Sequence, residues 1–145
     1  MKVHKIDHVG IVVNDLSAAK AFFLDFGFEV EGEGELKEEW VGRVIGLDNV
    51  KNAFVMLKTP DGQANIELIK FYAPLDERNT PIPFANTLGI RHIAFVVEEV
   101  EAIVAKLKNK GTEVIGEITN YQDTYKLCYV RGPEGIILEL AEQLK

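Results

Sequence analysis

The chain has 145 residues, a length that suits one domain with a sizeable core. Its 47% hydrophobic and 27% charged residues are typical of a soluble globular protein. The net charge of −7 argues against nucleic acid as a general partner, because phosphates need a basic patch, and it gives no support for an anionic membrane surface. The single cysteine, Cys128, cannot form an internal disulfide. With no signal-peptide pattern and no apolar run of membrane-spanning length, we expect a cytoplasmic protein.

The N-terminal half opens with an alternating, β-branched run that predicts a strand over residues 6–13. A strand places alternate residues on opposite faces. One face carries Val9, Ile11 and Val13, and the other carries His8, Gly10 and Val12. A helix should follow, capped by Asn14 or Asp15 and ended by Gly27.

The rest of this half predicts three further strands, over residues 28–31, 53–58 and 65–71. The acidic, glycine-containing residues 31–39 indicate a loop or a mobile edge. Residues 40–47 have no clear period, and we expect an irregular segment or a short helix near the mouth of a site. Residues 73–88 contain three of the five prolines and indicate a linker.

The C-terminal half repeats this order. A strand is predicted over residues 90–97, a helix with an apolar stripe from Val100 to Leu107 comes next, and Gly111 ends it. Strands are then predicted over residues 113–118, 125–130 and 136–141. Each half therefore has the order βαβββ, and the fold class is α+β.

The two halves are copies of one module. Residues 90–114 align with residues 6–30 without a gap, at an offset of 84 (90 − 6), and nine of the 25 positions are identical. The matches include His8 with His92 and Gly27 with Gly111. We expect a single domain over residues 1–145, built from repeats 1–72 and 89–145.

Four residues stand out as candidate metal ligands: His8 and His92 on the first strand of each module, and Glu67 and Glu139 on the last. Each glutamate lies between two larger apolar residues, which a strand places on the opposite face. If those neighbours pack on the helices, both glutamates and both histidines face away from the helices. Two imidazoles and two carboxylates suit one divalent cation, such as Zn²⁺, Ni²⁺, Co²⁺, Mn²⁺ or Fe²⁺. His4 has no counterpart in the second module, and we expect it at the surface.

The segments DHVGIVVNDL, ANIELIKF, GIRHIAFVVEEVEAIVAKLKNKG and CYVRGPEGIILELAE resemble the vicinal oxygen chelate superfamily over essentially the whole chain. This is the group of glyoxalases, bleomycin-resistance proteins and extradiol dioxygenases. The resemblance implies paired βαβββ modules forming a cupped mixed sheet around a metal, with helices on the outer face. It also implies metal ligands at first-strand and last-strand positions, here His8, Glu67, His92 and Glu139.

Within that superfamily the ligand set is most similar to that of glyoxalase I. The sequences that flank the ligands are most similar to those of methylmalonyl-CoA epimerase. Both imply a metal-dependent lyase or isomerase, in which Glu139 or Glu67 removes a proton beside a metal-polarised oxygen. Val12 or Val13 stands where glyoxalase I carries an arginine for its thiol-peptide substrate, and the extra glutamate of the epimerases is not evident near residues 47–49. An extradiol dioxygenase would use His8, His92 and Glu139 as its three metal ligands, and Glu67 would then not be needed as a ligand.

A protein that only sequesters a small molecule, as some resistance proteins do, is the alternative of a different class. A substrate pocket could then be lined by Trp40, Arg43, Phe54, Tyr121 and Tyr125. The resemblance also implies a homodimer, because small members usually pair. The partners we expect are a small-molecule substrate and a second copy of the chain.

Overall fold

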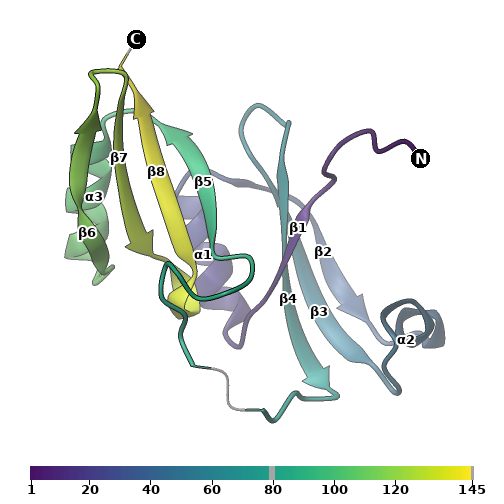
Figure 1. The fold of residues 1–145 in the computed structure, drawn as a ribbon. Helices are drawn as coiled ribbons and strands as arrows, with labels where there is room; N and C mark the ends of the chain where they lie inside the picture. Colours follow the sequence, from purple (N-terminus) through teal and green to yellow (C-terminus); the bar gives the residue numbers. More distant parts are fainter. Residues whose placement is uncertain (79–80, 145) are drawn as a thin grey trace. The chain divides into compact units, whose positions relative to one another are not determined.

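The computed structural model describes residues 1–78 and 81–144. The chain divides into two compact units, Met1–Asn79 and Thr80–Lys145, which we call the first and second modules. Each module contains a four-stranded mixed sheet built in the predicted order βαβββ (Figure 1). The α+β class and the duplicated module are therefore confirmed.

In the first module the strand order is β1-β4-β3-β2, with β1 parallel to β4 and the other pairs antiparallel. A second helix, absent from the other module, follows β2. The elements are β1 (Val9–Val12), α1 (Leu16–Asp25), β2 (Glu29–Leu36), α2 (Glu39–Ile45), β3 (Lys51–Lys58) and β4 (Asn65–Ala73).

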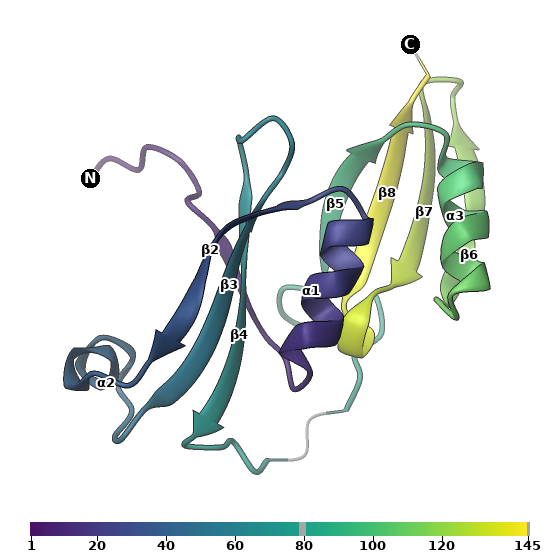
Figure 2. The ribbon, with the colours of Figure 1, turned by 180° about the vertical axis from the view of Figure 1, so that it is seen from behind.

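The second module has the equivalent order β5-β8-β7-β6, again with only its first pair parallel. Its helix α3 covers one face of this sheet (Figure 2). The elements are β5 (His92–Val97), α3 (Val100–Asn109), β6 (Val114–Tyr121), β7 (Tyr125–Arg131), the 3₁₀ turn Pro133–Gly135 and β8 (Ile137–Gln143).

Capping side chains and glycines determine where the two long helices, α1 and α3, begin and end. Asp15 caps α1, because its side chain accepts a hydrogen bond from the backbone N–H of Ala18 at 2.9 Å. Glu142 on β8 performs the same task for α3, accepting from the N–H of Val100 at 2.9 Å. Gly27 and Gly111, just past the two helices, have φ of 111° and 87°, which a residue with a side chain rarely adopts.

One face of each sheet forms the core against the helix of the same module. Leu57 and Leu68 in the first module, and Leu138 and Leu140 in the second, are completely buried. Burying one such side chain contributes about 1.5–3 kcal/mol relative to leaving it exposed. The other face is open in its own module: Val12 on β1 is 63% exposed and Val96 on β5 is 79% exposed. The predicted parity of both first strands is thus confirmed.

Two sequence expectations for the first module were wrong. The first strand begins at Val9, so His8 precedes the strand and does not lie within it. Of the two alternatives predicted for the acidic segment 31–39, the loop was wrong, because most of the segment is strand β2, and the place at an edge is confirmed. This strand lies at the sheet edge, where charged side chains are tolerated and discourage pairing with other chains. Lys20 on α1 also pairs with Glu33 at 2.8 Å.

The short helix expected near residues 40–47 is confirmed as α2. The linker expected over residues 73–88 lies partly outside the described residues, at 79 and 80; its described part contains no helix or strand beyond Ala73. Among the described residues, no helix is long and apolar enough to cross a membrane.

Candidate functional site

Both candidate glutamates occupy the same place in their sheets. The β1–β4 ladder pairs Gly10 with Glu67, and the β5–β8 ladder pairs Ala94 with Glu139. The apolar neighbours of each glutamate are buried in the core, so the carboxylates lie on the face opposite the helix. We call this face, in each module, the open face. Glycine and alanine beside the glutamates leave room there.

In the second module the structure brings His92 and Glu139 together. The imidazole Nε2 lies 3.2 Å from Oε2 of Glu139, and the side chains are 39% and 20% exposed. The other ring nitrogen, Nδ1, lies 3.4 Å from the hydroxyl of Tyr129, whose ring centroid is 5.1 Å from that of His92. Both edges of the imidazole therefore have a partner, which holds the ring with Nε2 toward the carboxylate.

This pair fits a divalent metal. Nitrogen and oxygen ligands bind such ions at about 2.0–2.2 Å, so adjacent ligands of one ion lie about 3.0–3.5 Å apart. The 3.2 Å between Nε2 and Oε2 falls in that range. A metal-ligating histidine also commonly has a second partner on its other nitrogen, the position that Tyr129 occupies. Among the described residues no group of three or more His, Cys, Asp or Glu side chains is clustered tightly enough to hold a metal.

In the first module His8 has a different partner. Its Nδ1 lies 2.7 Å from Oδ2 of Asp7, and this hydrogen bond lowers the pKa of the Asp7 carboxyl below its ordinary value. A carboxylate on Nδ1 leaves Nε2 as the nitrogen that can bind a metal. His4, expected at the surface, is exposed. The four-ligand site of His8, Glu67, His92 and Glu139 stays a prediction.

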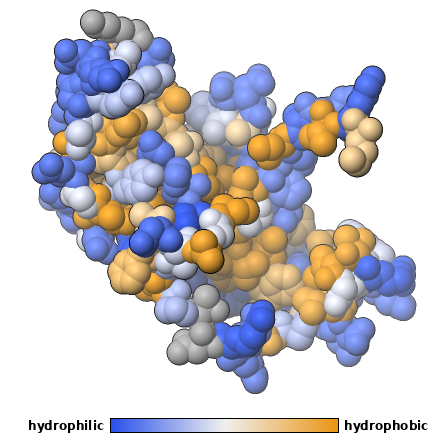
Figure 3. Space-filling model, viewed as in Figure 1, coloured by the Kyte–Doolittle hydropathy of each residue, from blue (hydrophilic) through white to orange (hydrophobic). Residues whose placement is uncertain are grey.

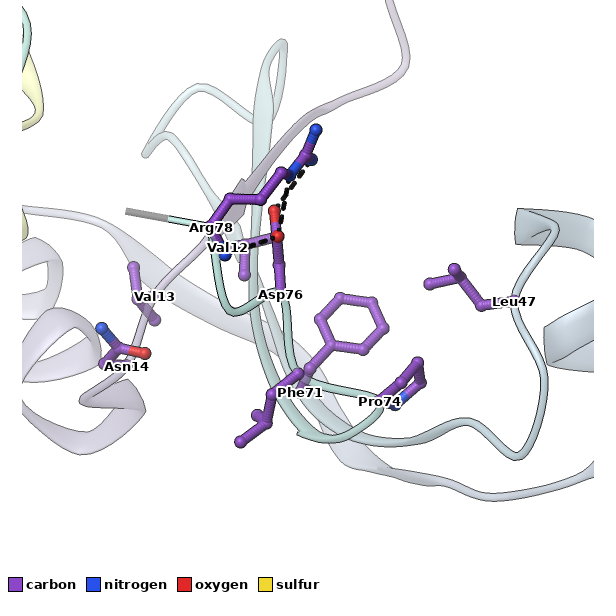
Figure 4. Close-up of a pocket in the computed structure, with 9 residues that line it drawn as sticks. Val12, Val13, Asn14, Leu47, Phe71, Pro74, Asp76 and Arg78 are labelled. Carbon is purple, nitrogen blue, oxygen red and sulfur yellow. Dashed lines mark hydrogen bonds and ion pairs between the residues drawn. The ribbon is translucent and has the colours of Figure 1, made fainter. Parts of the chain in front are cut away.

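A pocket of about 650 Å³ opens in the first module between the ends of β1 and β4, the turn after α2 and the segment after β4. Its walls include Val12, Leu47, Phe71 and Pro74, and the ring of Phe71 faces Leu47 (Figure 4). Apolar side chains also gather over this part of the module in the space-filling view (Figure 3). The sequence pointed to this region through the segment ending at Leu47 and through the position of Val12 and Val13.

Asp76 and Arg78 form an ion pair at the border of this pocket. Oδ1 and Oδ2 of Asp76 accept hydrogen bonds from Nε and Nη2 of Arg78, each at 2.9 Å, and the Arg78 backbone N–H donates to Oδ1 at 3.2 Å. These bonds lower the pKa of Asp76 to about 2, so the carboxylate is ionised at neutral pH. The pair has no net charge.

The side chains proposed from the sequence as substrate contacts lie on several elements, in the first and in the second module. Trp40 and Arg43 are on α2, where Arg43 pairs with Glu39 at 3.3 Å and Trp40 is 49% exposed. Phe54 on β3 pairs in register with Ile69, two residues from Glu67, so it shares the open face. Tyr121 and Tyr125 face each other across the β6–β7 turn. The described lining of the Val12 pocket includes none of these side chains, and their role in substrate binding stays a prediction.

Cys128 has the environment of a structural residue. It is 4% exposed on β7, and burial raises the pKa of its thiol above the ordinary value. A thiol that stays protonated at neutral pH is a poor nucleophile. Cys128 is therefore a poor candidate for a nucleophile.

Comparison with known proteins identifies the family. The model of the glyoxalase/bleomycin resistance protein/dioxygenase superfamily matches residues 7–129. The crystal structure of a glyoxalase family protein from Bacillus cereus superposes with a TM-score of 0.95 at 39% identity, covering 100% of this chain and 97% of that one. The Escherichia coli protein YaeR is 27% identical over 142 residues, 96% of either chain.

A more distant structure shares the fold: the trypanothione-dependent glyoxalase I of Leishmania major has a TM-score of 0.70 at 20% identity, covering 97% of this chain and 87% of that one. The family match spans β1 to β6, with helices α1, α2 and α3, and most of β7. The chain therefore belongs to the glyoxalase/bleomycin resistance protein/dioxygenase superfamily.

Proposed function

We propose that the protein is a metal-dependent isomerase or lyase of the glyoxalase/epimerase type, acting by proton transfer beside a carbonyl group of a small substrate. The observation that carries this proposal is the His92–Glu139 pair, with its 3.2 Å separation and its oriented imidazole. Members of the superfamily typically bind a divalent metal. We further propose His8, Glu67, His92 and Glu139 as its ligands, consistent with the equivalent positions of the two glutamates in their sheets.

A divalent cation bound there would supply a Lewis acid that polarises the substrate carbonyl and acidifies the neighbouring C–H bond. The chain supplies the base. Glu139 is half-buried beside His92, and a carboxylate in this position can accept the proton and return it to the adjacent carbon. Glu67 is the alternative base, because it occupies the equivalent position in its own ladder. This chemistry needs no nucleophile, in keeping with the buried thiol of Cys128.

The test is proton exchange in D₂O on a panel of 2-oxo aldehydes and acyl-CoA esters. We expect deuterium to enter the carbon next to the carbonyl, and Glu139→Gln to slow that exchange by about 10²–10⁴-fold, the usual contribution of a general base. The far-ultraviolet circular dichroism of the variant should match the parent.

Metal analysis is the companion measurement. The purified protein should hold about one divalent ion per module pair, and His92→Ala should lose it; full occupancy in that variant would overturn the ligand assignment. Catechol cleavage with O₂ consumption and no exchange would favour the dioxygenase. Tight binding without turnover would favour a sequestering protein.

We also propose that the protein forms a homodimer, as related proteins often do. Light scattering at micromolar concentration should give twice the 16.2 kDa chain mass. A stable monomer would contradict this.

A further inference from the structure

We propose that the pocket bordered by Val12, Leu47 and Phe71 binds an uncharged apolar substituent, alkyl or aryl, of the substrate whose carbonyl reacts beside Glu67. This inference rests on the proposed function, because it names the class of substrate that the same site accepts. It is carried by the position of the pocket, by its lining and by the charge at its border.

The pocket is on the open face, in line with Glu67. The β1–β4 ladder pairs Val12 with Ile69, two residues beyond Glu67, and Phe71 follows at the next position on the same face. A Cβ built on Gly10 would lie 3.7 Å from Cδ1 of Ile69, so the Ile69 side chain is on that face too. At about 3.3 Å per residue, the near wall lies about 7 Å along the strand from Glu67 and the far wall about 13 Å. A carbonyl compound held near Glu67 can therefore extend its substituent into the pocket.

The lining favours an apolar group. Five of its side chains, Val12, Val13, Leu47, Phe71 and Leu75, are hydrocarbon, and Pro74 adds a sixth apolar wall. The volume of about 650 Å³ is within the range of small-molecule sites, so it can hold a group larger than a methyl. Transfer of apolar surface out of water drives such binding.

The charged residues at the border of the pocket carry no net charge. Arg78 and Asp76 neutralise each other through two hydrogen bonds of 2.9 Å, so the guanidinium is already engaged by a carboxylate. The ion pair and Val12 on the wall therefore present no net charge to a substituent, and the apolar walls favour a neutral one.

The binding experiment uses acetophenone, a neutral aryl ketone, titrated into the full-length protein and followed by methyl NMR. We expect saturable shifts of the Val12 and Leu47 methyl groups, with the Val96 methyls, at the equivalent position of the second module, as an internal reference. Phe71→Ala should weaken binding by about tenfold. Tyr72→Ala removes an aromatic ring one residue away that is 46% exposed, and it should leave the affinity within about twofold.

A second variant guards against loss of folding. Leu47 is 43% exposed in the turn after α2, so Leu47→Ala disturbs the core little and should still weaken acetophenone binding. Unchanged affinity in both Phe71→Ala and Leu47→Ala, or equal shifts at Val96, would overturn the proposal.

Turnover separates this inference from the proposed function. Deuterium exchange into the methyl groups of acetophenone and acetone should give a lower KM for the aryl ketone in the parent, and Phe71→Ala should erase that preference. If the parent and Phe71→Ala show the same preference for the aryl compound, this inference is contradicted and the proposed function is not. If no substrate shows exchange but acetophenone still binds in the pocket, the proposed function is contradicted and the apolar binding site is not.

Discussion

The two modules have the same ladder but hold their histidines differently. In the second, His92 is the first residue of β5, and its Nδ1 lies near Tyr129, which pairs in register with Glu139. In the first, the residue that pairs with Glu67 is Met56, which has no hydroxyl. His8 precedes β1, and its Nδ1 is hydrogen-bonded to Asp7.

The difference shows that two copies of one module can orient equivalent histidines through different contacts. A metal-binding imidazole needs a partner on its other nitrogen to fix its orientation. The second module takes that partner from the neighbouring strand, and the first takes it from the preceding residue. Arg91, the counterpart of Asp7 at the offset of 84 (91 − 7), has a side chain that cannot accept a hydrogen bond, and the partner of His92 Nδ1 is the hydroxyl of Tyr129. The comparison suggests four experiments, given from the largest expected effect to the smallest.

The largest effect should come from the cores, which test whether the modules fold together. Leu68 and Leu140 are completely buried at equivalent positions. Leu68→Ala and Leu140→Ala should each lower the free energy of unfolding by about 2–5 kcal/mol. If the chain is a single domain, urea denaturation of both variants will show one transition moved to lower concentration. Two transitions, each moved by only one of the variants, would contradict the single domain.

The hydroxyl that holds His92 should matter for metal affinity. Tyr129→Phe keeps the ring and removes the group 3.4 Å from Nδ1, so we expect a loss of about 10–100-fold in affinity for Zn²⁺ or Ni²⁺. Chelator competition measures it. Met56→Leu, at the equivalent register position of the first module, is the matched control and should change nothing. Equal affinities in Tyr129→Phe and the parent would mean that the hydroxyl does not position the imidazole.

Asp7 should have a smaller effect, because its side chain is 70% exposed and water can replace it. Asp7→Asn should weaken metal binding by about tenfold or less at pH 7. The pKa of Asp7 is lowered below 3.8, mainly by its hydrogen bond to His8, so the carboxylate remains ionised at neutral pH. Any stability from this bond is present above the unfolded value and is lost as the pH falls through the lowered pKa.

Nitrogen-15 NMR of the imidazoles, in the parent and in Asp7→Asn, checks the contact directly. The His8 signals should change and the His92 signals should not. A change at both rings would show that the variant disturbs more than the Asp7 contact.

The smallest effect is expected at Cys128, whose ladder partner is Leu140; the counterpart in the first module is Val55, paired with Leu68. Cys128→Val should alter the free energy of unfolding by less than about 1.5 kcal/mol at pH 7, because the volume is similar.

The parent and Cys128→Val should differ in stability at high pH. Burial raises the pKa of Cys128 above 9.0, so the unfolded chain releases the thiol proton first as the pH rises. The parent should therefore lose stability above about pH 9 and Cys128→Val should not lose it by this route. Parallel pH profiles of Tm for the two proteins would show that the thiol does not titrate differently on folding.

The sequence alone determined the parts of this protein that depend on local pattern. Alternating apolar residues identified the strands and the open faces, because side chains along a strand alternate whatever the partner strand is. Val12 and Val96 are exposed, as that parity requires. Capping chemistry located α1 through Asp15 and Gly27. The repeat identified the α+β duplicated module, since both copies keep the same order of elements.

The tertiary structure decided what depends on contacts between distant segments. The sequence of the acidic segment 31–39 left a loop and a mobile edge as alternatives, and pairing with β3 makes most of the segment an edge strand. His8 falls outside β1 and turns to Asp7, whereas His92 meets Glu139 and Tyr129 across two ladders. The pocket of Val12, Leu47 and Phe71 gathers side chains from three separate segments. These contacts depend on the register between strands and on how distant segments of the chain come together. The periodicity within one segment carries no information about either.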